Sequence, residues 1–423
     1  MDNSISAPLW RRRNFQLLIG GRLVSQLGDQ LQFLALPLLV VALTGSATQA
    51  GVLLGLQTAL YLGFGLVAGA LADRWDRRTT MIWCEAGRAA LTASIPVAAA
   101  CGVLAMPQLY AVAVLTGALS TLFAAANSAA LPAIVTKDEL PRALGTIGVL
   151  SNTLRIAGAS VAGVAYAVGR TFPFAVNAAS FLVSAVALRS IRAGFHQERA
   201  GSQQERAGSQ RERARTSASP RALVAEIGQG LGWLWRTPMI RTLALIDAAD
   251  SLRYGAGYLL IIVLAQRLDA NPAQVGLVFT GAAAGALLGS VLAPVLTRRY
   301  PLGRLSIAML WAEALAFPFY AVAPVWGLLL VVAFAESVVS PIYNVALDSY
   351  RLAVTPDALR GRVTSAIDTL TTGGAAIGTM AAGALIALIG APVLTYVLAG
   401  WLTLLALTAS LSRTVRTAGA DLS

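Results

Sequence analysis

Twelve long apolar stretches constrain the fold of this chain more than any other feature of its sequence. A helix needs about 20 predominantly apolar residues to cross the hydrocarbon core of a bilayer. Only 12% of the residues are charged, whereas a soluble domain carries about 25%. The sequence therefore predicts an all-α membrane protein with twelve transmembrane helices, at approximately 15–43, 50–72, 79–101, 108–131, 144–168, 172–190, 239–265, 273–297, 305–322, 325–350, 362–389 and 392–412.

The basic residues lie mainly in alternate connections between these spans. With the N-terminus placed inside, 26 of the 32 arginine and lysine residues fall in inside segments, and two, Arg170 and Arg267, fall in outside loops. Basic residues accumulate in the cytoplasmic loops of membrane proteins. We therefore expect a multi-pass protein of the plasma (inner) membrane with both termini in the cytoplasm. The net charge of +12 then reflects topology rather than nucleic-acid binding.

A polar segment separates the sixth span from the seventh. The sequence Q-E-R-A-G-S-Q occupies 197–203 and is repeated at 204–210. The repeat has no apolar positions, so it predicts a disordered cytoplasmic linker rather than a coiled coil. Beyond Pro220, apolar residues return at helical spacing, which predicts a helix lying in the membrane interface. The predicted domains are an N-terminal six-helix bundle, a linker and a C-terminal six-helix bundle, at 1–190, 191–237 and 238–423.

The two predicted bundles share a sequence pattern. Asp29 and Asp250 are separated by the same interval as the arginine pairs that begin at Arg77 and Arg298, and a V-T-x-D-x-L motif recurs at nearly this interval. These residues lie in corresponding loops or spans, which indicates an internal duplication. Two parallel six-helix repeats are the organisation of one large class of transporters. The sequence therefore predicts two pseudo-symmetric bundles.

A charged turn at 69–78 reads G-A-L-A-D-R-W-D-R-R between two apolar spans. It resembles the loop signature G-x-L-A-D-R-x-G-R-[KR] of the major facilitator superfamily. The matching residues are Gly69, Leu71, Asp73, Arg74, Arg77 and Arg78, and Asp76 stands where the signature has glycine. The resemblance implies that Asp73 closes a cytoplasmic gate. The alternative is a turn that only sets the topology, while its arginines bind lipid headgroups.

Further stretches resemble one exporter branch of this superfamily, which includes enterobactin-type siderophore exporters and macrolide-efflux proteins. They are S-Q-L-G-D at 25–29, A-L-P-L-L-V at 35–40, L-T-G-S at 43–46 and P-D-A-L-R-G-R-V at 356–363. The resemblance implies two bundles around a central site, and export of a small compound by alternating access with proton antiport. Two departures count against antiport. Ala159 replaces the proline of the G-P-x-x-G-type element in the fifth helix, and span 108–131 has no basic residue.

The first span carries a polar face. Its members, which fall within about 120° on a helical wheel, are Arg22, Ser25, Gln26, Asp29 and Gln32. Asp29 lies near the middle of the span, where an isolated charge costs roughly 2.5–3.5 kcal/mol. Two interpretations follow. Asp29 either exchanges protons or contacts substrate, or it forms a buried ion pair with Arg155 that would keep it ionised.

Spans 239–265 and 325–350 carry further polar residues. These are Asp247, Asp250, Arg253, Tyr254 and Tyr258 in the former span, and Glu336, Ser340 and Tyr343 in the latter. Asp250 is a second coupling candidate, or else it is neutralised by Arg253 one turn away. Glu336 has no basic residue near it in the sequence, so it suits reversible protonation; the alternative is a hydrogen-bonded structural acid. Glu313 lies in the ninth helix, which the resemblance makes peripheral.

The sequence offers no catalytic, cofactor or metal site. The single histidine, His196, lies in a polar loop. Cys84 and Cys101 lie about 25 Å apart along one helix, too far for a disulfide. We expect a functional monomer, not an enzyme, that interacts with a small lipophilic compound, protons and the bilayer. Uptake or lipid flipping on the same fold, and a non-transporting scaffold or sensor, are the alternatives.

Overall fold

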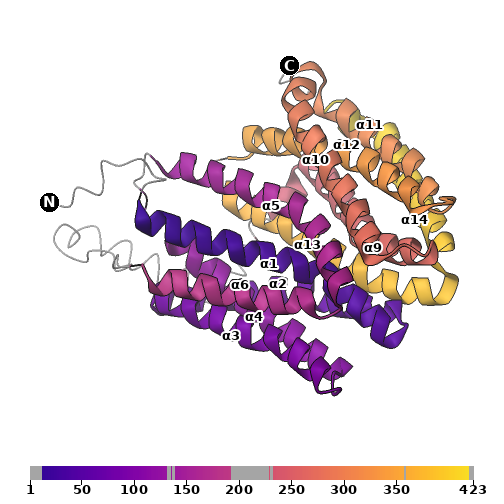
Figure 1. Ribbon diagram of the computed structural model, residues 1–423. Helices are drawn as coiled ribbons and strands as arrows, with labels where there is room; N and C mark the ends of the chain where they lie inside the picture. Colours follow the sequence, from indigo (N-terminus) through magenta and orange to yellow (C-terminus); the bar gives the residue numbers. More distant parts are fainter. Residues whose placement is uncertain are drawn as a thin grey trace, which may run out of the picture. The chain divides into compact units, whose positions relative to one another are not determined.

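The computed structural model describes residues 12–130, 135, 139–191, 228, 232–356 and 359–418, and this part of the chain is helical without a strand (Figure 1). In the first half the long helices are α1 (Arg13–Thr44), α2 (Ala47–Arg74), α3 (Arg77–Ala100), α4 (Met106–Ala130), α5 (Leu140–Val168) and α6 (Phe172–Arg189). In the second half they are α9 (Pro238–Arg267), α10 (Pro272–Arg299), α11 (Leu302–Ala316), α12 (Trp326–Val354), α13 (Arg360–Ile389) and α14 (Ala391–Leu411). The predicted all-α fold is confirmed, and a helix covers most of each predicted span.

The surfaces of these helices suit a lipid environment. Among the described residues, nine helices are long and apolar enough to cross a membrane. Large apolar side chains point outward along their lengths; Trp83, Val186, Leu388 and Leu411 are 64–78% exposed. Helices satisfy all their backbone hydrogen bonds internally, which is the requirement for crossing the bilayer. The protein is therefore a multi-pass membrane protein.

The ninth predicted span, 305–322, differs from a simple helix. α11 ends at Ala316, and the chain tightens into a 3₁₀ turn, η3 (Phe317–Tyr320). Pro318 has no N–H group to donate to a preceding carbonyl, so the regular α-helical hydrogen bonds are interrupted there. The turn brings Phe317 and Tyr320 into the core, where their exposed fractions are 1% and 2%.

The chain divides into two compact units. The first comprises Met1–Leu39 and Leu56–Thr216, and the second comprises Val40–Gly55 and Ser217–Ser423. The end of α1 and the start of α2 belong to the second unit. There the Thr48 hydroxyl donates a hydrogen bond to the Gly383 carbonyl of α13 at 2.9 Å. The domain boundaries at residues 190 and 238 stay a prediction.

In the first unit, α3 packs against α4 and α6. α1 approaches α6 closely at Gly28, because a Cβ there would lie 2.2 Å from the side-chain oxygens of both Asn177 and Ser180. The glycine therefore allows polar side chains of α6 to lie directly against the α1 backbone.

In the second unit, α10 packs along α12 through a row of glycines. A Cβ on Gly285 would lie 2.1 Å from the carbonyl oxygen of Phe334, and one on Gly289 would lie 2.1 Å from that of Val338. Small residues at four-residue spacing let membrane helices approach closely, where dispersion forces replace the hydrophobic effect.

The predicted linker lies mostly outside the described residues, so its tandem repeat and most of the interfacial helix are not described. Residues 232–236 are helical. Leu234 is fully buried against Ile240 and Ala244 of α9 and Val363 of α13. This part of the predicted interfacial helix is therefore packed on the second unit.

Candidate functional site

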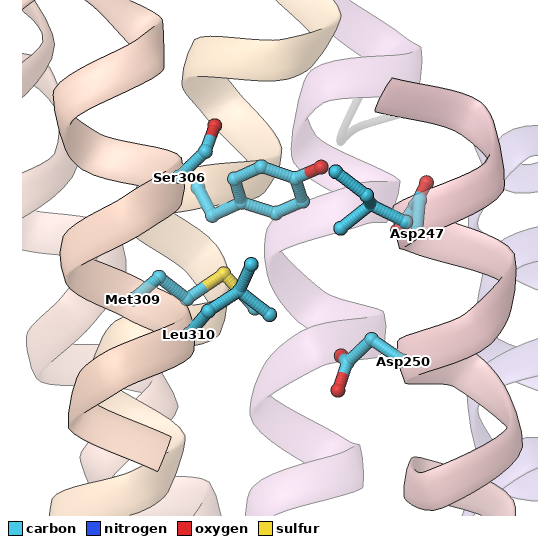
Figure 2. Close-up of a pocket in the computed structure, with 7 residues that line it drawn as sticks. Asp247, Asp250, Ser306, Met309 and Leu310 are labelled. Carbon is cyan, nitrogen blue, oxygen red and sulfur yellow. The ribbon is translucent and has the colours of Figure 1, made fainter. Parts of the chain in front are cut away.

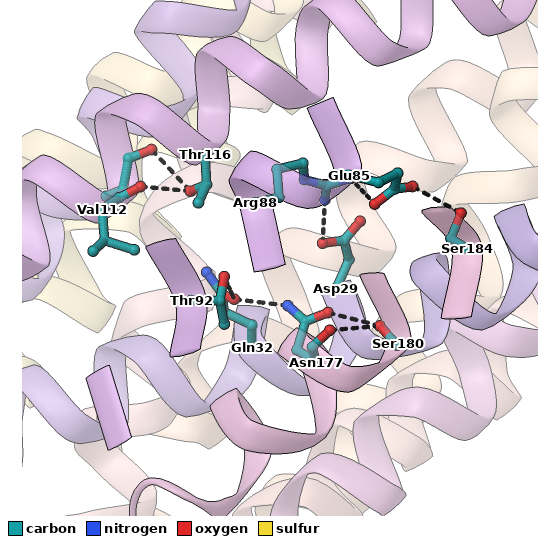
Figure 3. Close-up of polar contacts among 11 residues, drawn as sticks. Asp29, Gln32, Glu85, Arg88, Thr92, Val112, Thr116, Asn177, Ser180 and Ser184 are labelled. Carbon is teal, nitrogen blue, oxygen red and sulfur yellow. Dashed lines mark hydrogen bonds and ion pairs between the residues drawn. The ribbon is translucent and has the colours of Figure 1, made fainter. Parts of the chain in front are cut away.

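A charged cluster joins α1 and α3 inside the first unit. Arg88 Nη2 lies 2.5 Å from Asp29 Oδ1, and Arg88 Nη1 lies 3.6 Å from Glu85 Oε2 (Figure 3). The Ser184 hydroxyl of α6 donates to Glu85 Oε1 at 3.0 Å, and the Arg88 guanidinium lies 4.0 Å from the centre of the Phe181 ring. The side chains of Arg88 and Glu85 are 5% and 0% exposed, whereas that of Asp29 is 43% exposed. We refer to Asp29, Glu85 and Arg88 as the Arg88 cluster.

Uncharged polar groups lie beside the Arg88 cluster (Figure 3). The Asn177 amide donates to Gln32 Oε1 at 2.7 Å, and the Thr92 hydroxyl donates to the same oxygen at 3.4 Å. The Ser180 hydroxyl donates to Asn177 Oδ1 at 3.1 Å. These bonds join α1, α3 and α6, so they fix the face of α1 that carries Asp29.

The structure gives Asp29 a partner that the sequence did not indicate, which is Arg88. The side chain of Arg155 lies outside the described residues, so the alternative ion pair of Asp29 with Arg155 stays a prediction. Sequence reasoning missed Glu85 and Arg88 as site residues, although both lie within a predicted apolar span. A glutamate and an arginine at i and i+3 inside such a span were the available signal.

A second charged cluster surrounds Arg253 in the second unit. Arg253 Nη2 lies 3.0 Å from Asp250 Oδ1 on α9 and 3.0 Å from Glu313 Oε2 on α11. Arg253 Nη1 also forms an ion pair with Glu336 of α12, and the Tyr320 hydroxyl donates to the other oxygen of Glu336 at 2.8 Å. The exposed fractions of the four charged side chains range from 1% for Glu313 to 14% for Asp250. We refer to these four charged residues as the Arg253 cluster.

This geometry corrects two expectations from the sequence. Glu336 is not without a basic partner, because Arg253 binds it from a helix that is distant in the sequence. Glu313 is not peripheral, because its carboxylate binds the same guanidinium. The Asp250–Arg253 pair that spacing predicted is present. Local sequence shows neither of the contacts made by Glu336 and Glu313, because they join different helices.

A third ion pair lies on α9 and α12. Arg351 Nη2 lies 2.8 Å from Asp247 Oδ2, and Arg351 Nη1 lies 3.5 Å from Asp348 Oδ1. The side chains of Arg351 and Asp247 are 16% and 19% exposed, while that of Asp348 is 67% exposed. Asp247 is therefore paired, and Arg351 is a site residue that the sequence did not single out.

The other predicted residues lie apart from the charged clusters or at their edges. Gln26 accepts a hydrogen bond from Ser151 of α5 at 2.9 Å. Tyr254 is 67% exposed, with its ring 6.0 Å from the Arg253 guanidinium. The centre of the Tyr258 ring lies 4.8 Å from that of Phe279, and the two ring planes are tilted by 36°. Arg22 and Ser340 are half-buried, and Arg22 forms no salt bridge with the described residues.

The charged turn between α2 and α3 is a helix-capping structure. Gly69 and Arg74 lie near the end of α2, and Asp76 is the N-cap of α3, whose Oδ1 accepts from the Thr79 N–H at 2.8 Å. Arg78 donates to the Leu188 carbonyl at 3.1 Å and also to the Arg189 carbonyl, at the C-terminal end of α6. The Asp73 side chain lies outside the described residues, so the predicted gate stays a prediction. The capping bond explains why an acid suits position 76.

Comparisons with known proteins agree with this architecture. The family model of the Major Facilitator Superfamily matches residues 18–249 and 248–421. The Multidrug efflux pump Tap of Mycobacterium tuberculosis is 26% identical over 91% of this chain and 88% of its own length. An uncharacterized MFS-type transporter of the same species is 29% identical over 84% of this chain and 81% of its own. The crystal structure of the nucleoside transporter NupG has the same fold, with a TM-score of 0.72 at 14% identity over 94% of this chain and 98% of its own.

Proposed function

Because the chain belongs to the major facilitator superfamily, we propose that it exports a small lipophilic compound across the plasma membrane by alternating access, coupled to proton entry. Export is the direction that the name of the multidrug efflux pump relatives supports. Both termini would be cytoplasmic, because that orientation places most of the basic residues inside. The functional unit would be a monomer.

The proposal of proton coupling rests mainly on the Arg253 cluster. It places three carboxyl groups around one guanidinium in a site that is almost closed to solvent. A buried carboxylate without a compensating charge is strongly unfavourable in a low-dielectric interior. The excess acids are therefore suited to hold protons and to release them when their surroundings change.

The Arg88 cluster supports the proposal from the first unit. It has two carboxyl groups for one guanidinium, and Asp29 is the more exposed of the two. Asp29 can therefore meet water or substrate, while Glu85 is enclosed. A cationic or zwitterionic lipophilic compound is the class that an accessible carboxylate among apolar helices would bind.

Transport by the purified full-length protein in liposomes tests this function. The lipophilic cation ethidium serves as the probe, and a pH gradient of either sign is imposed across the liposome membrane. We expect ethidium to move against its gradient only when protons move in the opposite direction. Ethidium flux that ignores the pH gradient would contradict antiport. Movement of fluorescent phospholipid in place of ethidium would support lipid flipping instead.

A further inference from the structure

Arg253 does not bind its three acids in the same way. Asp250 accepts three hydrogen bonds from it, since Nε and Nη2 donate to Oδ1 at 3.1 and 3.0 Å and Nη2 also donates to Oδ2 at 3.3 Å. Glu336 accepts a hydrogen bond at each of its two oxygens, from Arg253 and from Tyr320. Among the described residues, only Arg253 Nη2 donates to Glu313, at 3.0 Å. Glu313 is therefore the acid whose negative charge would be least compensated.

Glu313 is also the most deeply buried of these acids. Its side chain is 1% exposed, against 11% for Glu336 and 14% for Asp250. Burial strongly disfavours a carboxylate that lacks a full set of opposite charges and hydrogen bonds. A protonated carboxyl group is neutral and can itself donate a hydrogen bond. Glu313 is therefore the member of the Arg253 cluster best suited to carry a proton.

Asp250 supplies the acceptor for this proton. Figure 2 shows Asp250 projecting from α9 toward Met309 of α11, the helix that also carries Glu313. The side chains of Asp250 and Glu313 are joined by a hydrogen bond, and each has an oxygen 3.0 Å from Arg253 Nη2. Ionised carboxylates only accept hydrogen bonds, so a bond between two carboxyl groups requires a proton on one of them. Because both oxygens of Asp250 already accept from Arg253, the proton belongs to Glu313.

Glu336 is held in the ionised form by two donors. Arg253 Nη1 binds its Oε1, and the Tyr320 hydroxyl donates to its Oε2 at 2.8 Å. Tyr320 reaches it from η3, the turn that follows α11. Because one carboxylate neutralises one guanidinium, Glu336 alone balances Arg253, and Asp250 can take a proton. Without Glu336, Asp250 would be needed as the ionised partner of Arg253 and could not take it.

We propose that Glu313 holds the coupling proton and passes it to Asp250 through their direct hydrogen bond, while Glu336 stays the fixed counter-ion of Arg253. In this step the O–H bond of Glu313 breaks and an O–H bond to Asp250 forms. Glu313 is left as a carboxylate that accepts from Arg253 Nη2, which contacts both acids and can balance either one. The small cavity beside Asp250 exposes only apolar surface, so it offers no competing polar group. This step rests on the proposed proton coupling.

The ionisable groups that face Glu313 or Asp250 come from α9, η3 and α12. They are Asp247 and Arg253 on α9, Tyr320 on η3, and Glu336 and Tyr343 on α12. α14 packs against both α9 and α11 but carries no charged side chain. On α13, Asp368 interacts with Arg351 and Asp348 instead. The arginines of α15 lie near the start of α11, where Val415 meets Gly303, whereas Glu313 lies near its end.

Infrared spectroscopy of the full-length protein in lipid at neutral pH locates the proton without a substrate. The C=O band of protonated carboxyl groups is compared in unlabelled protein and in protein made with isotopically labelled glutamate or aspartate. We expect the glutamate label to shift a component of this band that Glu313→Gln removes and Glu336→Gln retains. The matched control is Glu85→Gln, at a buried glutamate of the first unit, which should leave this component unchanged.

Two results would overturn the assignment of the proton to Glu313. The first is a component that shifts with the aspartate label instead, which would place the proton on Asp250; this measurement on the wild type needs no variant. The second is a component that is lost in Glu336→Gln but retained in Glu313→Gln.

Exchange of the same component into heavy water tests the transfer. Asp250→Asn can still accept a hydrogen bond from Glu313, but it cannot take the proton. We expect the component to persist in Asp250→Asn and its exchange to slow by at least about 10-fold, because a positioned proton acceptor accelerates transfer by about 10²–10⁴-fold. The control is Asp269→Asn, at an exposed acid of the same unit. Exchange at the wild-type rate in Asp250→Asn would overturn the transfer, and loss of the component there would overturn Glu336 as the fixed counter-ion.

A parallel measurement of ethidium flux separates failure of this proton site from failure of the proposed function. A glutamate component that Glu313→Gln removes, together with wild-type ethidium flux that ignores the pH gradient, would uphold the site and overturn antiport. Ethidium flux driven by the pH gradient in a protein whose proton lies on Asp250 or Glu336 would overturn the site and uphold antiport.

Discussion

Arg88 Nη2 on α3 lies 2.5 Å from Asp29 Oδ1 on α1, so the negative charge of Asp29 is balanced by an arginine from another helix. In the second unit the corresponding acid, Asp250, is bound by Arg253 of its own helix, α9. Each unit therefore places one arginine among two or more carboxyl groups. Both halves have this acid, but its arginine comes from a different helix in the first half and from the same helix in the second half.

Loss of Arg88 should destabilise the first unit. Arg88→Gln leaves Glu85, which is fully buried, without its compensating charge. Breaking a buried ion pair by removing one partner costs about 3–5 kcal/mol. We expect a lower melting temperature for the purified protein in detergent. The double variant Glu85→Gln/Arg88→Gln should recover part of the loss, and Arg170→Gln, at an exposed arginine of the same unit, should have little effect. An unchanged melting temperature for Arg88→Gln would contradict the buried pair.

Removal of the cap at Asp76 should destabilise α3 modestly. Asp76→Ala loses the hydrogen bond to the Thr79 N–H, which costs about 1 kcal/mol, while Asp76→Gly costs only a few tenths and Asp76→Ser retains the bond. The expected order of melting temperatures is wild type and Asp76→Ser, then Asp76→Gly, then Asp76→Ala. If Asp76→Ala matched wild type, position 76 would have no capping role.

Larger residues in the glycine row of α10 should separate this helix from α12. Gly285→Ala places a Cβ 2.1 Å from the Phe334 carbonyl oxygen, and overpacking of this kind costs about 1–3 kcal/mol. The control is Gly400→Ala, where a Cβ meets nothing within 4 Å. We expect a lower melting temperature for Gly285→Ala alone. Equal stability of the two variants would show that α10 and α12 do not pack this closely.

The helices were predictable from sequence because hydropathy and the length of each apolar run report directly on transfer into lipid. The partners of the buried acids were not. Asp250 and Arg253 are one turn apart, so their pairing follows from helix geometry alone. Glu313 and Glu336 reach Arg253 from α11 and α12. Such a pairing depends on the rotation of each helix, and nearly uniform apolar spans do not specify that rotation.

The central claim is that the excess carboxyl groups of the Arg253 cluster carry the coupling protons. The most direct test is pH-driven ethidium transport in liposomes by wild type, Glu313→Gln and Glu336→Gln. Asp269→Asn, at an exposed acid of the same unit that belongs to none of the charged clusters, is the matched control. We predict that both cluster variants lose at least about 10-fold of the pH-driven flux, while Asp269→Asn keeps it. Wild-type flux in both cluster variants, at equal protein levels, would contradict the account.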